Sequence, residues 1–224
     1  MCGRFTLTVD PEQFQEAFPG VDMGPGPALR YNIAPTQPVA VIPNNHPDRL
    51  DYFIWGLIPS WAKEPGIGSR LINARADTLA QKPSFRSAYR RRRCLIPASG
   101  FYEWKAVTAS KTKMPMYLTL SSGLPFAFAG LWEFWQSPDG SELLSCTIVT
   151  TEPNELVAEI HDRMPVILPP AAYSLWLDPN ERRPEELDGL LKPYPAAEMV
   201  AYPVSRQVNS PQIDTPQLIL PVAG

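Results

Sequence analysis

The first four residues, Met1-Cys2-Gly3-Arg4, place a cysteine where it can become N-terminal. Removal of Met1, which is usual before a small second residue, would give Cys2 a free α-amine beside its thiol. The ordinary pKa values of these groups, about 7.7 to 8.0 and about 8.5, leave both partly nucleophilic near neutrality. An aldehyde would form an imine with the amine and then a thiazolidine with the thiol, whereas an amide or ester would form a thioester. Taken alone, Cys2 is more often simply the residue after the initiator.

Two further side chains could transfer protons. Glu103 lies between Tyr102 and Trp104, and aromatic neighbours of this kind would raise its pKa and make it a general acid. The alternative is an exposed carboxylate on the polar face of a strand, with both aromatics pointing into the core. His161 ends an expected helix, where the dipole favours the imidazolium form. It is the natural proton-transfer candidate because His46, the other histidine, lies in a polar loop, although a helix cap or structural hydrogen bond is an equal alternative.

Several polar and aromatic residues could bind nucleic acid. Residues 70–113 carry eleven basic side chains and two acidic ones in a chain of net charge −3. Such asymmetry could create a basic face for phosphates, although residues 90–93, an arginine run, suit a solvated surface equally well. Trp61, if exposed, could stack on an unpaired base for about 1–3 kcal/mol, but core packing is the commoner fate of tryptophan. Asn73 and Arg75 could be simply a helix N-cap and a surface cation.

The composition excludes several classes of protein. A chain of 224 residues with 44% hydrophobic residues suits one globular domain, and no apolar run approaches the roughly 18 residues of a membrane span. Acidic residues interrupt any N-terminal signal sequence, so a cytoplasmic protein without membrane contact is expected. Three cysteines without CxxC spacing and two histidines indicate neither a disulfide framework nor a metal centre. No phosphate-binding glycine-rich motif is present, and no cofactor is expected.

Short elements must position these residues. Alternating apolar residues and turn residues predict strands over residues 3–9, 31–35, 39–42, 50–57, 94–97, 100–105, 116–120, 126–134, 143–150 and 200–204. Residues 10–18, 76–81, 154–161, 170–177 and 185–191 are expected to be helical, with a loop over 20–28 and a hairpin turn over 137–140. Strand 3–9 should be half-buried and should anchor Cys2. This pattern predicts an α+β fold with an antiparallel, partly closed sheet or barrel and peripheral helices.

Eight motifs occur in the order seen in SRAP (SOS response-associated peptidase) domain proteins, which the chain therefore resembles. They are Met1-Cys2-Gly3-Arg4, Tyr31-Asn32-Ile33-Ala34-Pro35, Trp55-Gly56-Leu57-Ile58-Pro59, Asn73-Ala74-Arg75, Gly100-Phe101-Tyr102-Glu103-Trp104, Ile148-Val149-Thr150-Thr151, His161-Asp162-Arg163-Met164-Pro165 and Pro203-Val204-Ser205. The resemblance covers residues 2 to about 206 and implies a single domain over 1–224, with a C-terminal tail over 207–224.

The resemblance implies a sensor of abasic sites in single-stranded DNA that protects them as a covalent crosslink. Cys2 would form a thiazolidine with C1′ of the ring-opened sugar, and Asn73 would orient Cys2 or the sugar. Glu103 would assist ring opening and proton transfer, while His161 would serve imine formation and reversal. The other implied DNA contacts are Arg4, Arg75 and Thr150 on phosphates, Trp61 stacking near a single-strand/duplex junction, and Pro35 and Trp104. Some members have a second aromatic where this chain has Ala62, so the wedge is expected to be smaller.

A monomer is expected, associated with the nucleoid in a bacterium or located in the nucleus of a eukaryote. Two rival functions stay open. An N-terminal-nucleophile peptidase or amidase could use Cys2, Glu103 and His161 for acyl transfer, including removal of its own Met1. A non-catalytic single-strand-binding module would need only the basic face.

Overall fold

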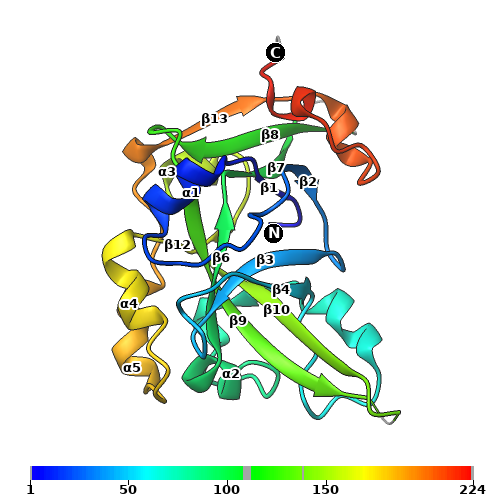
Figure 1. The fold of residues 1–224 in the computed structure, drawn as a ribbon. Coiled ribbons are helices and arrows are strands. Elements are labelled where there is room, and N and C mark those ends of the chain that lie inside the picture. Colours follow the sequence, from blue (N-terminus) through cyan, green and yellow to red (C-terminus); the bar gives the residue numbers. More distant parts are fainter. Residues whose placement is uncertain (1, 108–111, 138, 223–224) are drawn as a thin grey trace.

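A computed structural model describes residues 2–107, 112–137 and 139–222 of the chain. Met1, Lys111 and Pro138, which enter the expectations above, lie outside the described residues. The strands form two sheets, one above the other in Figure 1. The first sheet is antiparallel and has the order β13 (Met199–Pro203), β8 (Lys113–Leu120), β7 (Gly100–Ala106), β1 (Phe5–Leu7) and β2 (Arg30–Ile33).

The second sheet closes into a five-stranded barrel. Its strands are β3 (Pro38–Pro43), β4 (Asp51–Trp55), β6 (Arg93–Ala98), β9 (Phe126–Gln136) and β10 (Glu142–Thr151). All neighbours pair antiparallel except β4 and β10, whose parallel pairing, with Cys146 opposite Trp55, completes the ring. Three short strands extend it, namely β5 (Asn73–Arg75) and β11 (Met164–Pro165) on β10 and β12 (Ile167–Leu168) on β9. The predicted α+β fold with a barrel core is confirmed.

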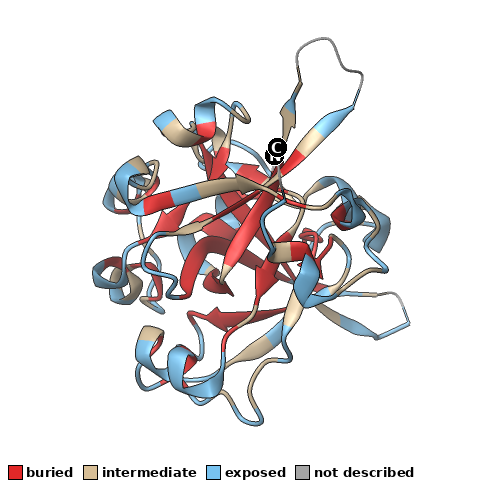
Figure 2. Cartoon of the chain, turned by 90° about the horizontal axis from the view of Figure 1, so that it is seen from above, coloured by how far each residue is buried: buried red, intermediate tan, exposed pale blue. Residues whose placement is uncertain are grey.

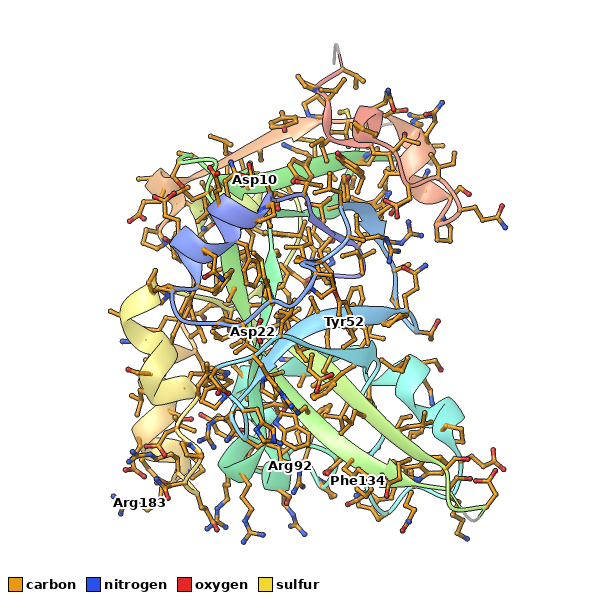
Figure 3. All side chains as sticks on the ribbon, viewed as in Figure 1. Asp10, Asp22, Tyr52, Arg92, Phe134 and Arg183 are labelled. Atoms are coloured by element: carbon orange, nitrogen blue, oxygen red, sulfur yellow. The ribbon has the colours of Figure 1, made fainter. Side chains whose placement is uncertain are left out.

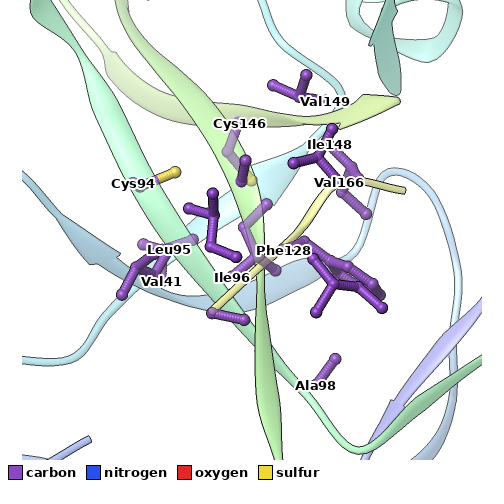
Figure 4. Packing of buried hydrophobic residues seen from close by; sticks show 14 of the residues in the cluster. Val41, Cys94, Leu95, Ile96, Ala98, Phe128, Cys146, Ile148, Val149 and Val166 are labelled. Carbon is purple, nitrogen blue, oxygen red and sulfur yellow. The ribbon is translucent and has the colours of Figure 1, made fainter. Parts of the chain in front are cut away.

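Apolar side chains of both sheets form the main core. Figure 4 shows part of it, where Ile96 of β6, Phe128 of β9 and Ile148 of β10 lie among other buried residues. Phe5 of β1 joins the two sheets, because its ring lies edge-on to Trp55 at 5.2 Å and to Phe128 at 5.7 Å. Figure 2 shows buried strands at the centre, with helices and loops exposed around them. The strand that follows Cys2 is therefore fixed by the core of the whole molecule.

The prediction that the first strand is half-buried holds for Arg4 and Thr8, which are half-buried, but is wrong for Thr6. Phe5, Thr6 and Leu7 are all buried. The Thr6 hydroxyl lies 2.8 Å from the Tyr117 hydroxyl and 3.3 Å from the Gly100 carbonyl, so this polar side chain has hydrogen-bond partners inside the protein. Burial of a polar group is tolerated when it is hydrogen-bonded. The alternation of apolar and polar residues could not reveal that the polar face of the strand is also covered at Thr6.

Short helices surround the sheets. The α-helices are α1 (Pro11–Ala17), α2 (Arg86–Arg91), α3 (Glu155–Ala158), α4 (Tyr173–Trp176) and α5 (Pro184–Leu187). The 3-10 helices are η1 (Pro65–Arg70), η2 (Ala76–Thr78), η3 (Pro170–Ala172), η4 (Asp188–Leu190), η5 (Ala196–Glu198), η6 (Arg206–Asn209) and η7 (Pro216–Ile219). In the described ranges, no helix has the length and apolarity needed to cross a membrane.

The helix predictions are partly confirmed. Asp10 caps α1 by accepting a hydrogen bond from the Gln13 backbone N–H, as its sequence indicated. The stretch over 76–81 contains only the 3-10 turn η2, and the stretch over 154–161 contains only the single turn α3. Residues 170–177 and 185–191 each divide into a 3-10 turn and a short α-helix. The helix α2, which ends at Arg91 within the arginine run, was not predicted.

Candidate active site at the N-terminal cysteine

Two hydrogen bonds fix the backbone at Cys2 and just after it. The Asn73 side-chain amide donates to the Cys2 carbonyl at 2.9 Å. Two residues later, the Arg4 carbonyl accepts from the Tyr102 backbone N–H at 3.0 Å, which continues the pairing of β1 with β7. The Cys2 thiol is fully buried. Burial and the charge of Glu103 raise its pKa, so this thiol is protonated near neutral pH.

Asn73 contacts the Cys2 backbone and caps no helix. It opens β5, where it lies opposite Ile148 of β10, and η2 begins beyond Arg75 without a side-chain cap. The parallel pairing of β5 and β10 brings its amide to Cys2. Its Oδ1 atom is buried and has no hydrogen-bond partner among the described residues. The N-cap interpretation of Asn73 is therefore wrong.

Glu103 is a buried carboxyl on β7 and is only 2% exposed, so the alternative of an exposed strand glutamate is wrong. Burial raises its pKa, and nearby positive charges, His161 among them, oppose only part of this effect. Tyr102 belongs to a second buried cluster with Tyr117, and Trp104 packs against that cluster. The expected direction of the Glu103 pKa shift is confirmed.

His161 lies beside Glu103. Its Nε2 atom is 4.0 Å from Glu103 Oε2, and its side chain is 22% exposed. Its Nδ1 atom lies 2.9 Å from Asp162 Oδ1 and 3.1 Å from the backbone nitrogen of Arg163. The His161 N–H also donates to the Val157 carbonyl and closes the last turn after α3. Four candidate residues from distant segments are thus connected. Asn73 bonds to Cys2, the charge of Glu103 acts on the Cys2 thiol, and His161 lies 4.0 Å from Glu103.

The residues expected to bind DNA have varied surroundings. Trp61 is 58% exposed, so its indole is available for stacking, and Pro35 is half-buried after β2. Arg75 is exposed and bound to Asp77. Thr150 lies opposite Arg75 in the paired strands, but it is fully buried, and its hydroxyl has no hydrogen-bond partner in the described part of the chain.

Arg4 and Trp104 contact residues 207–224, the segment predicted to be a C-terminal tail. Arg4 donates to Asn32 Oδ1 at 2.8 Å and to the Val208 carbonyl at 2.6 Å. Trp104 Nε1 donates to Asn209 Oδ1 at 2.8 Å. The segment after β13 therefore packs over the end of β1 and holds two residues that flank Cys2 and Glu103.

Two further residues anchor this segment. The Asn32 amide donates to the Ser210 and Ile213 carbonyls, at 2.9 and 2.7 Å. Asp214 accepts from the Asn32 backbone at 3.0 Å and pairs with Arg30. Asn32 lies inside one of the eight motifs, which was a usable signal for a role, whereas Asp214 carries no local signal.

The arginine run does not form a free basic face. Arg93 is fully buried and donates five hydrogen bonds to the backbone carbonyls of Tyr89, Arg90, Trp176, Asp178 and Asn180. Arg90 and Arg91 share Glu181, while Arg92 pairs with the buried Glu133. Figure 3 shows Arg92 at the opposite end of the molecule from Asp10, which follows β1. The expectation that this run lies solvated or on a phosphate-binding face is wrong for Arg93.

Two other features are separate from this site. A cavity of about 700 Å³ between α1 and α4 has mostly apolar walls and contains none of the candidate residues. All three cysteines are buried and free, and the described residues contain no group of three His, Cys, Asp or Glu side chains that could hold a metal.

Comparison with known proteins matches the chain to one family. A family model described as SOS response associated peptidase (SRAP) matches residues 1–211. The abasic site processing protein YoqW of Bacillus subtilis is 49% identical over 226 residues, which cover 98% of this chain and 99% of the relative. The abasic site processing protein HMCES of Gallus gallus is 34% identical over 191 residues, covering 75% of this chain and 56% of the relative. A crystal structure of a protein from Bacteroides thetaiotaomicron superposes with a TM-score of 0.87 at 27% identity, covering 99% of this chain and all of that one.

Proposed function

Because the chain belongs to the SRAP family, we propose that it processes abasic sites in DNA, and does so by forming a covalent bond through Cys2. The observation that carries the proposal is the convergence on the N-terminus. Asn73 donates a hydrogen bond to the Cys2 carbonyl, the charge of Glu103 acts on the Cys2 thiol, and His161 lies 4.0 Å from Glu103. A damage-responsive role in DNA repair accords with the names of the relatives.

The reactive form is the chain without Met1, in which Cys2 carries a free α-amine and a thiol. Abasic deoxyribose exists partly as an open-chain aldehyde at C1′. The amine attacks this carbon, and loss of one water gives an imine. The thiol then adds across the C=N bond, so that sulfur binds C1′ and the proton passes to nitrogen, closing the thiazolidine.

The surroundings of Cys2 favour this order of steps. In the chain that carries Met1, burial and Glu103 raise the pKa of the thiol, so the thiolate is scarce at neutral pH. After removal of Met1, the amine is the group proposed to attack first, and the thiol adds once the imine has formed. An acyl-transfer peptidase would instead use the thiolate at its first step.

Glu103 and His161 divide the proton transfers between them. The pKa of Glu103 is raised by burial, which increases the protonated fraction available to open the sugar ring and to protonate the departing water. His161 transfers protons between Glu103 and solvent, because its Nε2 atom lies 4.0 Å from the Glu103 carboxyl and its side chain is partly exposed. The same pair serves reversal through the imine.

The DNA strand is proposed to run across the face that presents Trp61 and Arg75, the two exposed members of the expected set. Single-stranded DNA suits this face because stacking and phosphate contacts need no base sequence. Trp61 is assigned to the junction between single strand and duplex. Arg4, Pro35 and Trp104 complete the proposed binding surface, whereas Thr150, which is fully buried, could reach a phosphate only if its surroundings moved. The protein is proposed to act as a monomer.

The test compares two single-stranded oligonucleotides that differ only in one abasic site. Met1-free protein is incubated with each strand and separated on a denaturing gel. We expect a band of protein bound to DNA with the abasic strand alone, and loss of this band in Cys2→Ser. Binding without a covalent band would overturn the proposal, and release of peptide from a thioester-forming substrate would favour the peptidase.

A further inference from the structure

The Asp77 carboxylate is shared by two arginines from different parts of the chain. Arg75, at the end of β5, reaches it through two nitrogens, with NH2 at 2.7 Å from Oδ2 and Nε at 3.2 Å from Oδ1. Arg163, which follows α3, places NH2 at 3.3 Å from Oδ2. Two guanidinium groups around one carboxylate form the arrangement that also binds a phosphate.

This cluster lies at the surface. The side chains of Arg75 and Asp77 are 50% and 49% exposed, and that of Arg163 is 19% exposed. Ion pairs with this much exposure add little to stability, so the carboxylate can be displaced without disturbing the fold. Arg75 and Arg163 hold the pKa of Asp77 below its usual value, and the carboxylate is charged at neutral pH.

The position of the cluster connects it to the active site. Asp77 and Arg163 line a surface hollow of about 410 Å³ together with Thr151 and Glu152. Arg163 follows His161 by two residues, and Arg75 follows Asn73 by two residues. Residues two apart in a strand share a face, so Arg75 lies on the same face of β5 as Asn73, and a strand bound at Cys2 is expected to pass near this carboxylate.

We propose that Asp77 is a built-in competitor for a DNA phosphate. In the free protein it occupies the hydrogen-bond donors of Arg75 and Arg163, and a bound strand must take these donors from it. The competition weakens noncovalent binding to every strand, damaged or intact. Lasting capture then depends on the covalent bond at Cys2, which only an abasic site can form. This inference rests on the proposed function.

The test measures noncovalent affinity for an intact single-stranded oligonucleotide by fluorescence anisotropy across a salt series. Asp77→Asn keeps the size of the side chain but removes its charge. We expect Kd to fall about 3- to 10-fold at low salt, and the slope of log affinity against log salt to steepen by about 0.7 for each further phosphate that the protein neutralises. Adding Arg75→Ala to Asp77→Asn should return the affinity to the wild-type level or below it.

Glu181→Gln is the matched control, because Glu181 is also shared by two arginines, Arg90 and Arg91, but at the surface of α2. It removes the same charge and should leave the affinity unchanged. Unchanged or weaker binding by Asp77→Asn overturns the inference. An equal rise in affinity in Glu181→Gln overturns it too, as does the absence of measurable binding in both the wild type and Asp77→Asn. Failure of the proposed function is a separate result, namely no covalent adduct between wild-type protein and the abasic strand.

Discussion

Replacement of Glu103 by glutamine tests what burial of this carboxyl does to the reaction. Glutamine keeps the size of the side chain but cannot donate a titrating proton. General acid catalysis contributes about 100- to 10,000-fold to a rate. Because His161 Nε2, at 4.0 Å, can still transfer protons, we expect the lower end of this range, about 100-fold slower crosslinking.

The pH profile should change as well. Wild-type crosslinking should rise with pH as the Cys2 amine loses its proton, and fall as Glu103 loses its own proton above its raised pKa. The product of these two requirements is a bell-shaped profile. Glu103→Gln should keep the rising limb and lose the falling one.

The same substitution should stabilise the fold at neutral pH. Because burial raises the pKa of Glu103, the folded state holds this proton more tightly than the unfolded chain. The stability that results is fully present below the unfolded pKa of about 4.3 and is lost as pH rises through the folded value. Glutamine suffers no such loss. We expect Tm at pH 7.5 to rise by about 2–4 °C, equivalent to about 1 kcal/mol for a chain of this length, with the difference shrinking towards pH 4.

The assay quenches single-turnover reactions of Met1-free protein with an abasic oligonucleotide between pH 5 and 8, and follows thermal unfolding at pH 4 and 7.5. Glu133→Gln is the matched control, because Glu133 is also buried, with its pKa raised by burial, but it pairs with Arg92 on the barrel. Its crosslinking rate should equal that of the wild type. A Glu103→Gln rate within about 2-fold of wild type, with the bell-shaped profile intact, would refute the role of Glu103 as the acid, and a lower Tm at pH 7.5 would refute the effect assigned to burial.

Two other substitutions test the fold and the DNA-binding face. Arg93→Met should destabilise the fold by about 3–5 kcal/mol and lower Tm by roughly 10 °C, because five hydrogen-bonded carbonyls lose their donor. Calorimetry measures this change in stability. A loss below about 1 kcal/mol would contradict the prediction. Trp61→Ala should leave Tm unchanged, since the indole is 58% exposed, but weaken noncovalent binding to a junction oligonucleotide by about 10-fold in anisotropy titrations, equivalent to about 1.4 kcal/mol. Trp61→Phe should retain part of the affinity, and equal binding by all three proteins would contradict the stacking role.

The strands of the fold could be predicted because their signals are local. Alternating apolar residues marked the five strands of the barrel, and the residues around Asp10 marked α1. The very short strands β5, β11 and β12 carry too few residues for any period and exist only because β9 and β10 offer them partners. The parallel pairing of β4 with β10 depends on contacts between distant residues and had no local signal.

Buried polar residues were the main source of error in the sequence predictions. Thr6 and Arg93 are polar by type and fully buried in fact, each because distant groups satisfy its hydrogen bonds. Arg90 and Arg91 in the same run are exposed, so composition could not distinguish them from Arg93. Three of the carbonyls that Arg93 binds lie at the end of α4 and beyond it, more than 80 residues along the chain.

The candidate site was predicted by residue type and not by geometry. The chemistry of an N-terminal cysteine singled out Cys2, and the lone carboxyl among aromatics singled out Glu103. The hydrogen bond from Asn73 to Cys2 required the position of β5. The roles of Asn32 and Asp214 required the C-terminal segment to fold back over β2, which no local pattern indicates.

The mass of the intact adduct tests the proposed chemistry of Cys2 most directly. Met1-free protein is mixed with an abasic single-stranded oligonucleotide, and the product is weighed without reduction. We expect the summed mass of protein and DNA less one water, resistant to hydroxylamine, and no adduct when Met1 or an N-terminal tag blocks the amine of Cys2. An adduct that forms equally well on the blocked chain, or one that hydroxylamine releases as a thioester, would contradict the thiazolidine.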